Sequence, residues 1–136
     1  MSNTTDPTND PLHELLVDDA QSIDRNRLAT FLKPLARFDR ETKEPHFLPG
    51  FESIVSNDAK IEAVLLVSKT QSLIFGEPEG MSPIDIIKLD IMPEGSVKTS
   101  IKKLSDGRKI KKSAAGKYIV PNYRINEIVE RVRGKE

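Results

Sequence analysis

Apolar positions are sparse at the start of the chain and become periodic only after residue 20. Residues 1–11 are polar and rich in Asn, Thr, Asp and Pro, so they cannot bury enough apolar surface to offset the entropy lost on ordering. The apolar residues from Leu12 to Val17 are expected to dock as one or two helical turns. We predict a disordered acidic tail over residues 1–20.

A first amphipathic helix is predicted from the spacing of apolar side chains in residues 22–38. Ser22 or Asp24 can cap its start, because both side chains accept hydrogen bonds from unpaired backbone N–H groups. Pro34 should kink or end the helix, since it lacks a backbone donor. The apolar side chains that recur along one helical face are Leu28, Phe31, Leu32 and Leu35.

The helical spacing of apolar residues stops between Phe38 and Phe51. A polar turn at residues 39–44 separates two short extended pieces, and each proline keeps the residue before it extended. This pattern predicts a small hairpin or an ordered loop. Residues 21–56 are therefore expected to form an N-terminal extension ahead of a main domain at residues 57–133.

A long helix is predicted at the start of the main domain. Asn57 or Asp58 can cap it, and Gly76 can end it in a left-handed conformation. Its centre, residues 63–67, is apolar on every side. We expect this helix to lie inside the core.

Two shorter helices are predicted after the sequence GEPEG at residues 76–80. In the first helix, Ser82 and Pro83 suit the cap and the first helical position. A tight connection at residues 90–92 leads to the second helix. The buried side of the first helix is expected to consist of Ile84, Ile87 and Ile91.

The second helix opens at Pro93 and Glu94, because proline is preorganised for a first turn and an acid there complements the positive helix end. Its apolar stripe recurs at i, i+4 and i+7 and consists of Val97, Ile101 and Leu104. At about 100° per residue, the opposite face is basic and hydroxylic. That face carries Ser96, Lys98, Thr99, Lys102 and Lys103.

A β-hairpin and a final helix complete the pattern. The runs GRKIKK and GKYIVP are short, extended and separated by SAAG, and Gly116 can supply the positive φ of the turn. Asn122 is expected to cap the last helix. The apolar face of that helix consists of Ile125, Ile128, Val129 and Val132.

Positive charge is concentrated in this C-terminal part, although the net charge of the chain is zero. Residues 93–122 contain eight Lys or Arg and two acids, a balance of +6. The rest of the chain contains 13 Lys or Arg and 19 acids, a balance of −6. Such segregation creates a local field that attracts polyanions.

The order of long helix, short helix, tight turn, basic helix, basic hairpin and helix resembles the winged helix-turn-helix family over residues 57–133. The segment IDIIKLDIMPEGSVKTSIKKL looks like the second and third helices of that family, and GRKIKKSAAGKYIVP is similar to its wing. The resemblance implies a mainly α fold with a small β-hairpin wing. It also implies a DNA-binding protein, a small transcriptional regulator, whose third helix enters the major groove of double-stranded DNA.

The resemblance also implies a role for each polar residue on this surface. Contacts to base edges fall to Ser96, Lys98, Thr99 and Lys102. Contacts to phosphate fall to Lys103, Lys111, Lys112, Ser113 and Lys117. Arg108, at the start of the wing, completes the predicted DNA-binding set. Because the helix face carries no Arg, Asn or Gln, we expect substantial affinity and modest sequence specificity.

Composition argues against several other classes of protein. The chain has no cysteine, which excludes disulfides and thiolate chemistry. No apolar run approaches the roughly 18 residues needed to span a bilayer, and the N-terminus does not resemble a secretory signal, so we expect a cytoplasmic protein. His13 and His46 are isolated, and no Gly-rich phosphate loop is present. We therefore expect neither an enzyme nor a bound metal or other cofactor.

Other interpretations are compatible with the same sequence. A basic helix face can be a solvated surface, and lysines on a hairpin can protect a strand edge from aggregation. Winged-helix domains also serve as protein–protein adaptors, and lysines that contact phosphate can bind RNA as well as DNA. Regulators of this class often dimerise. The helix at residues 28–35 or the one at residues 125–132 could form a homodimer, or either could pack within the monomer.

Overall fold

The computed structural model describes residues 10–16 and 23–133 of the 136-residue chain. These residues are mainly helical, with two antiparallel hairpins of two strands each. The elements in chain order are η2 (Pro11–Leu15), α1 (Arg25–Leu32), β1 (Ala36–Phe38), β2 (Pro45–Phe47), α2 (Pro49–Glu52), α3 (Asn57–Phe75), α4 (Pro83–Lys88), α5 (Glu94–Asp106), β3 (Lys111–Lys112), β4 (Tyr118–Ile119), η3 (Asn122–Arg124) and α6 (Ile125–Arg133).

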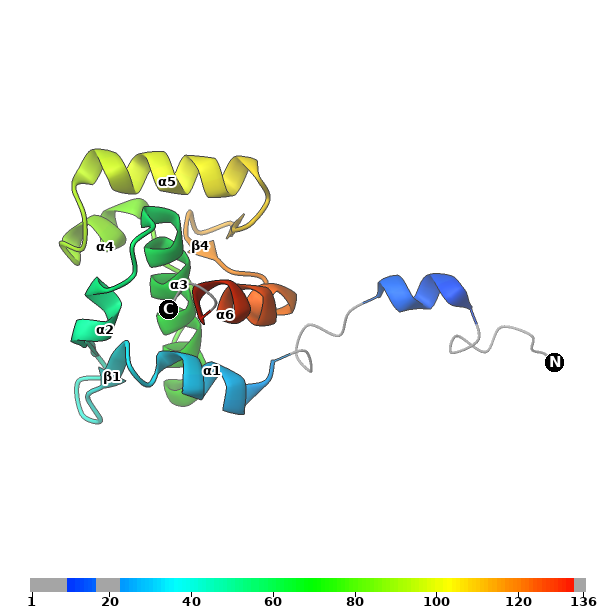
Figure 1. The fold of residues 1–136 in the computed structure, drawn as a ribbon, viewed down its shortest axis with the longest axis horizontal. Helices are drawn as coiled ribbons and strands as arrows, with labels where there is room; N and C mark the ends of the chain where they lie inside the picture. Colours follow the sequence, from blue (N-terminus) through cyan, green and yellow to red (C-terminus); the bar gives the residue numbers. More distant parts are fainter. Residues whose placement is uncertain (1–9, 17–22, 134–136) are drawn as a thin grey trace.

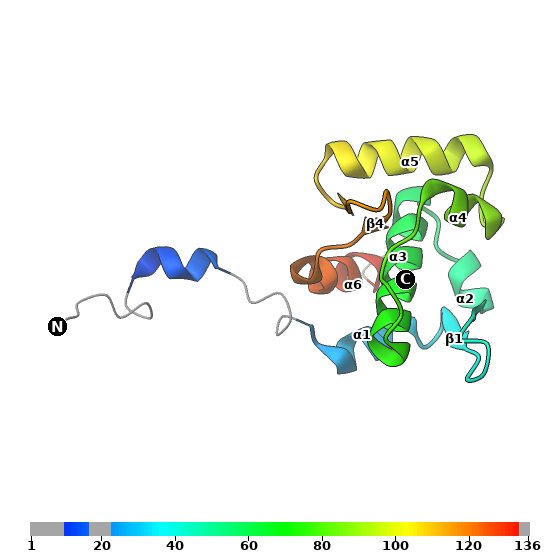
Figure 2. The same ribbon diagram turned by 180° about the vertical axis from the view of Figure 1, so that it is seen from behind.

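Helix α3 runs through the middle of the molecule, with α5 across one end and α1 across the other (Figures 1 and 2). Every residue from Ile61 to Lys69 is buried, which confirms the predicted core helix. The helix ends at Gly76, whose φ of 73° is left-handed as expected. Its cap is Ser56, one residue before the expected Asn57, and the Ser56 hydroxyl accepts the N–H of Ala59 at 3.2 Å.

The N-terminal helix and hairpin are also confirmed. Asp24 caps α1 by accepting the N–H of Arg27 at 3.0 Å, whereas Ser22 lies outside the described residues. The helix ends at Leu32, two residues before Pro34. Strands β1 and β2 then pair in antiparallel register, from Ala36 opposite Phe47 to Phe38 opposite Pro45.

One hydrophobic core joins this N-terminal part to the later helices. Helix α1 packs on α6, and the ring of Phe38 lies edge-on to that of Phe75 with centroids 6.3 Å apart. The buried residues of α1 are Leu28, Phe31 and Leu32, and those of α6 are Ile125, Ile128 and Val129. The apolar faces of α1 and α6 therefore pack within one chain.

Two further predictions about helix faces and caps are wrong. Ile84 is 63% exposed, and Ile86 is the fully buried residue of α4, whereas Ile87 and Ile91 are half-buried. Helix α4 has only six residues, so its own period does not define a face and the contact with α5 decides which isoleucine is buried.

Asn122 does not cap the last helix. It is the first residue of the 3-10 turn η3, which follows Pro121 and leads directly into α6. The side-chain oxygen of Asn122 accepts a hydrogen bond from the ammonium of Lys69 instead. The burial of Lys69 within α3 explains this partner, because a buried ammonium needs acceptors around it.

Residues 10–16 form the helical turn expected near the start of the chain. Asp10 caps η2 by accepting the N–H of Leu12 at 2.9 Å. Leu12, Leu15 and Leu16 are exposed rather than docked. The rest of the predicted tail lies outside the described residues. Among the helices of the described ranges, none is both long enough and apolar enough to cross a bilayer.

Candidate nucleic-acid interface

Helix α5 presents the predicted polar face to solvent. Its apolar stripe is buried against α3 and α4, and consists of Val97, Ile101 and Leu104 together with Ser100. Burial of that stripe fixes the rotation of the helix about its axis. The exposed side chains are Lys98, Thr99, Lys102 and Lys103, and Ser96 is half-buried. All five therefore lie where the sequence placed them.

The connection between α4 and α5 sets the angle at which this face is presented. Ser82 and Asp85 form a capping box at the start of α4, with N···O distances of 3.0 and 3.1 Å. Asp90 then turns the chain with a φ of 57°, a conformation that Asp tolerates better than most residues. Pro93 occupies the cap position of α5, and Glu94 is its first helical residue.

The predicted hairpin is confirmed and lies next to the start of α4. Lys111 pairs with Ile119 and Lys112 with Tyr118. A bridge between Met81 and Tyr118 adds two backbone hydrogen bonds, of 2.8 and 3.1 Å. The hairpin is thus held to the segment that leads into α4.

The turn of the hairpin uses the predicted glycine. Gly116 has a φ of 77°, and its N–H donates to the carbonyl of Ser113 at 3.0 Å. The N–H of Ser113 donates to the carbonyl of Lys117 at 2.7 Å, which closes the loop. Arg108, in the turn that follows α5, also has a left-handed φ of 59°. This turn redirects the chain from α5 to β3.

A shallow hollow of about 310 Å³ joins the α5 face to the hairpin. Lys98 and Lys102 line it from α5, and Tyr118 lines it from β4. The ammonium of Lys112 lies 5.9 Å from the centroid of the Tyr118 ring, within the range of a cation–π contact. The lysines of the helix and of the hairpin therefore border one surface.

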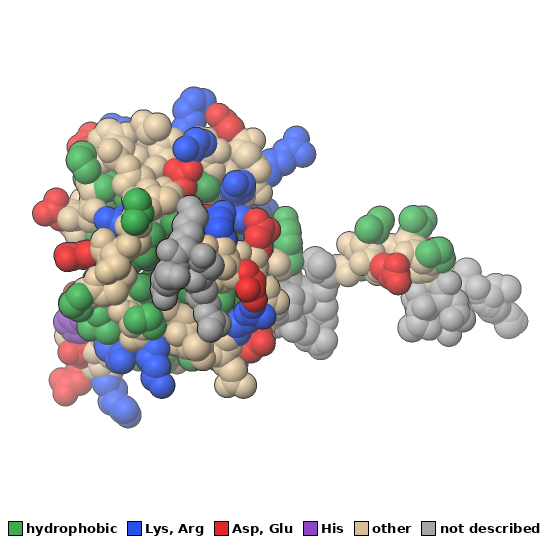
Figure 3. Space-filling view, viewed as in Figure 1, with side chains coloured by type: hydrophobic (Ala, Val, Ile, Leu, Met, Phe, Trp, Pro, Cys, Tyr) green, Lys and Arg blue, Asp and Glu red, His purple; other side chains and the backbone are tan. Residues whose placement is uncertain are grey.

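Carboxylates lie among these lysines, as the mixed colours over α5 in Figure 3 show. Two pairs are local to α5, Lys98 with Glu94 at 3.1 Å and Lys102 with Asp106 at 3.2 Å. Within the described part of the chain, Arg108, Lys111 and Lys112 have no carboxylate at ion-pair distance.

Two further ion pairs join segments that are distant in sequence. Lys103 lies 3.0 Å from Asp58 at the start of α3, and Lys117 lies 3.7 Å from Asp85 in α4. Neither acid was predicted to be part of this surface. Nothing in the local pattern indicates them, because only the packing of α3 and α4 on α5 and β4 brings them near the lysines.

A second hollow, of about 370 Å³, lies between α5 and the N-terminus of α3. Ser96, Thr99 and Lys103 line it from α5, and Asn57 and Asp58 line it from α3. The hollow is rich in hydrogen-bonding groups, which suits contact with a polar partner. The carboxylate of Asp58 lowers its positive charge.

The acid beside the hairpin has a perturbed titration. The backbone N–H of Ser82 donates to the Asp85 carboxylate and lowers its pKa, and partial burial opposes this effect. The Ser82 hydroxyl and the nearby Lys117 lower the pKa further. Asp85 is therefore ionised at neutral pH, and it holds the start of α4 and the hairpin together.

A buried ionic cluster, which was not predicted from the sequence, contacts the chain just before the hairpin. The Glu62 carboxylate, fully buried in α3, accepts a hydrogen bond from Arg124 at 2.9 Å and another from Arg131. Arg124 also donates to the carbonyl of Lys109 at 2.6 Å, next to β3. The available signal in the sequence was the acid Glu62 directly before the apolar residues 63–67, because a buried charge needs a partner.

The two histidines do not join a cluster of possible metal ligands. His46 lies 3.9 Å from Asp39 in the N-terminal hairpin, and His13 lies in η2. Among residues 10–16 and 23–133, no group of three or more His, Cys, Asp and Glu side chains is arranged to hold a metal ion.

Comparison of the chain with protein-family models, with curated proteins and with solved structures finds no match.

Proposed function

We propose that this protein binds double-stranded DNA through α5 and the hairpin β3–β4, as a small transcriptional regulator of the winged helix-turn-helix class. The observation that carries the proposal is the surface shared by the two elements. Lys98 and Lys102 border the same hollow as Tyr118, and Lys112 lies over the ring of that tyrosine. A phosphate backbone laid along this surface would meet lysines from both elements.

The geometry of α4 and α5 supports the same function. A short helix, a tight turn and a longer helix with an exposed polar face are the parts that place a recognition helix in a major groove. Helix α5 has 13 residues, and its exposed side is free of large apolar side chains. In this proposal Ser96, Lys98, Thr99 and Lys102 face the bases.

The remaining predicted residues contact phosphate in this proposal. They are Lys103, Arg108, Lys111, Lys112, Ser113 and Lys117. Four of the lysines on the surface pair with carboxylates, but exposed pairs of this kind contribute only about 0–1 kcal/mol each. Phosphates can replace such partners at little cost, because each lysine exchanges one anion for another.

The experiment is a fluorescence anisotropy titration of labelled duplex DNA of random sequence at low salt. The test variant carries Lys102→Gln, Lys103→Gln and Lys112→Gln. The control carries Arg25→Gln, Lys33→Gln and Arg40→Gln, which removes the same charge from exposed positions outside the interface. We expect the test variant to weaken binding by at least tenfold and the control to bind like the wild type.

The comparison separates local contacts from net charge. Equal weakening by both variants would mean that only overall charge attracts the DNA, and it would reject the interface. Circular dichroism of both variants confirms that each is folded. A parallel titration with duplex RNA decides between the two nucleic acids, because lysine contacts to phosphate do not distinguish them.

A protein–protein adaptor is the second candidate function. The observation in its favour is that Asp58, Asp85, Glu94 and Asp106 already pair with lysines of the surface. A surface of mixed sign is typical of protein interfaces that use charge for orientation. Absence of any DNA or RNA binding by the wild type at low salt would favour this function.

A further inference from the structure

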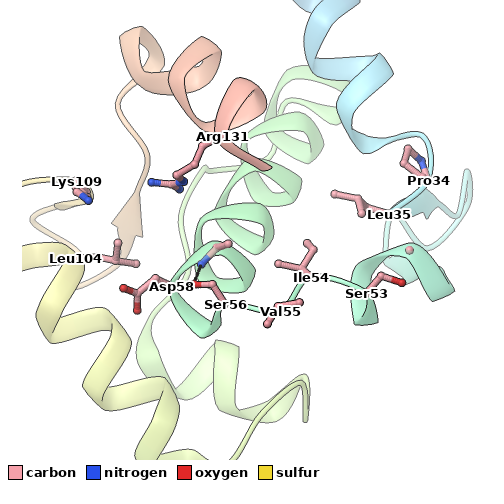
Figure 4. Close-up of a pocket in the computed structure, with 12 residues that line it drawn as sticks. Pro34, Leu35, Ser53, Ile54, Val55, Ser56, Asp58, Leu104, Lys109 and Arg131 are labelled. Carbon is pink, nitrogen blue, oxygen red and sulfur yellow. Dashed lines mark hydrogen bonds between the residues drawn. The ribbon is translucent and has the colours of Figure 1, made fainter. Parts of the chain in front are cut away.

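A third cavity, of about 400 Å³ and largely apolar, lies beside the proposed DNA interface and shares Asp58 with it (Figure 4). Leu35, Ile54 and Val55 line one side of it, after α1 and before α3. Val55 is 93% exposed at this site, although an aliphatic side chain gains free energy from burial. Leu35 and Ile54 are themselves buried, so Val55 is the one of these three apolar side chains that the described residues leave uncovered.

The opposite side of the cavity is charged and includes Lys109, which acts on the carboxylate of Glu127 from beyond ion-pair distance. Asp58 pairs with Lys103, and Arg131 pairs with the buried Glu62. Lys109 also lines the cavity, and no carboxylate of the described residues lies within ion-pair distance of it. An occupant with apolar side chains and negative charge would match both sides.

Residues 10–16 of the same chain have these properties. Leu12 and Leu15 are three residues apart in the 3-10 turn and therefore lie on one side of it, Leu16 follows in an extended conformation, and all three are at least 67% exposed. The segment also contains Asp10 and Glu14 and no Lys or Arg. A short helix with an apolar face of this kind is a common ligand for hydrophobic grooves.

We propose that residues 10–16 dock in this cavity, with the leucines against Ile54 and Val55. A cavity of about 150 Å³ holds a benzene molecule, so 400 Å³ is sufficient for two leucine side chains. The acids of the segment add a long-range attraction to Lys109. The contact does not depend on DNA binding.

The chain is long enough to make this contact within one molecule. Residues 17–22 connect the segment to α1 and can span about 20 Å when extended. Helix α1 has eight residues and is therefore about 12 Å long. The cavity wall starts directly after that helix, at Pro34 and Leu35.

Disulfide trapping tests the contact, because the chain contains no cysteine of its own. The test protein carries Leu15→Cys and Val55→Cys, and the control carries Leu15→Cys and Ile84→Cys. All three positions are exposed, so the substitutions do not disturb the core. A disulfide needs Cα atoms within about 7 Å, so its rate of formation reports proximity. A third protein adds Leu12→Ser and Leu16→Ser to the test pair.

We expect the test pair to form an intramolecular disulfide at least ten times faster than the control pair, and the two serines to remove most of that advantage. Equal rates for the test and control pairs would overturn the proposal. An unchanged rate in the serine variant would also overturn it, since the leucines would then play no part. Disulfide-linked dimers whose yield rises with protein concentration would place the segment on a second copy and contradict docking within one chain.

Discussion

The ammonium of Lys103 lies 3.0 Å from the carboxylate of Asp58, so an ion pair joins α5 to the first turn of α3. The pair has two effects. It places an acid at the positive end of the central helix, and it neutralises a lysine that the proposed function assigns to phosphate. One substitution, Asp58→Asn, removes both effects, and each effect has its own measurement.

Asp58→Asn is expected to strengthen binding to duplex DNA, by up to about tenfold at low salt, because Lys103 gains a phosphate contact. The same change should lower the free energy of unfolding by about 0.3–1 kcal/mol, since α3 loses a favourable charge at its N-terminus. Anisotropy and urea titrations measure the two quantities. Glu52→Gln, an exposed acid on α2, is the control for net charge. Unchanged or weaker DNA binding by a folded Asp58→Asn protein would contradict the assignment of Lys103.

The buried cluster around Glu62 should be sensitive to the loss of a cation. Arg124→Met leaves the Glu62 carboxylate with Arg131 as its remaining described partner, and we expect a loss of about 3–5 kcal/mol in the free energy of unfolding. Glu127→Gln is the matched control, because Glu127 pairs with the same arginine at 2.9 Å but is 60% exposed. Glu127→Gln should lower the free energy of unfolding by less than about 1 kcal/mol. If both variants lose the same free energy of unfolding in urea, burial of the charge is not the deciding factor.

Two glycines are expected to respond to alanine in opposite ways. A Cβ on Gly50 would lie 2.3 Å from the backbone oxygen of Pro34. Gly50→Ala should therefore lower the free energy of unfolding by about 1–3 kcal/mol, because the chain between α1 and α2 has to shift. A Cβ on Gly95 would meet nothing within 4 Å, in the first turn of α5. Gly95→Ala should raise stability by about 0.5–1 kcal/mol. Thermal unfolding of both variants checks the two signs, and a neutral Gly50→Ala would refute the close approach.

Asp85 should contribute a pH-dependent part of the stability. Its pKa is lowered from 3.8 in the folded protein, foremost by the hydrogen bond from the Ser82 backbone, so its contribution is complete above pH 3.8 and is lost as pH falls through the folded pKa. Asp85→Asn keeps an acceptor for Ser82 but removes the charge. We expect the variant to be less stable than the wild type at pH 7, and the difference to be smaller at pH 2, because the charge of Asp85 is lost as the pH falls below 3.8. A difference that is the same at both pH values would assign the effect to shape and not to charge.

Long elements with a clear period could be predicted from the sequence. The apolar centre of α3 and the stripe of Val97, Ile101 and Leu104 each extend over several turns, so local pattern and tertiary packing agree. The hairpin could be predicted from its two short extended runs, from the linker SAAG between them and from Gly116. These elements also fixed which polar side chains of α5 face solvent.

Short elements and distant partners could not be predicted in the same way. Six residues of α4 do not define a face, which is why Ile84 and not Ile86 was expected in the core. Asp58 and Asp85 join the lysine surface only through the packing of helices that lie far from those lysines in sequence. Pairing of this kind has no local signature, and it lowers the positive charge that the sequence assigned to the surface.

The dependence of DNA affinity on salt tests the central claim most directly. If four or five lysines of α5 and the hairpin contact phosphate, the logarithm of the binding constant for duplex DNA should fall with the logarithm of salt concentration at a slope near about −4. Anisotropy titrations of the wild type at several salt concentrations measure this slope. A value near −4 is the result expected for a lysine interface on the phosphate backbone. A slope near zero would show that these lysines do not contact phosphate and would contradict DNA binding by this surface.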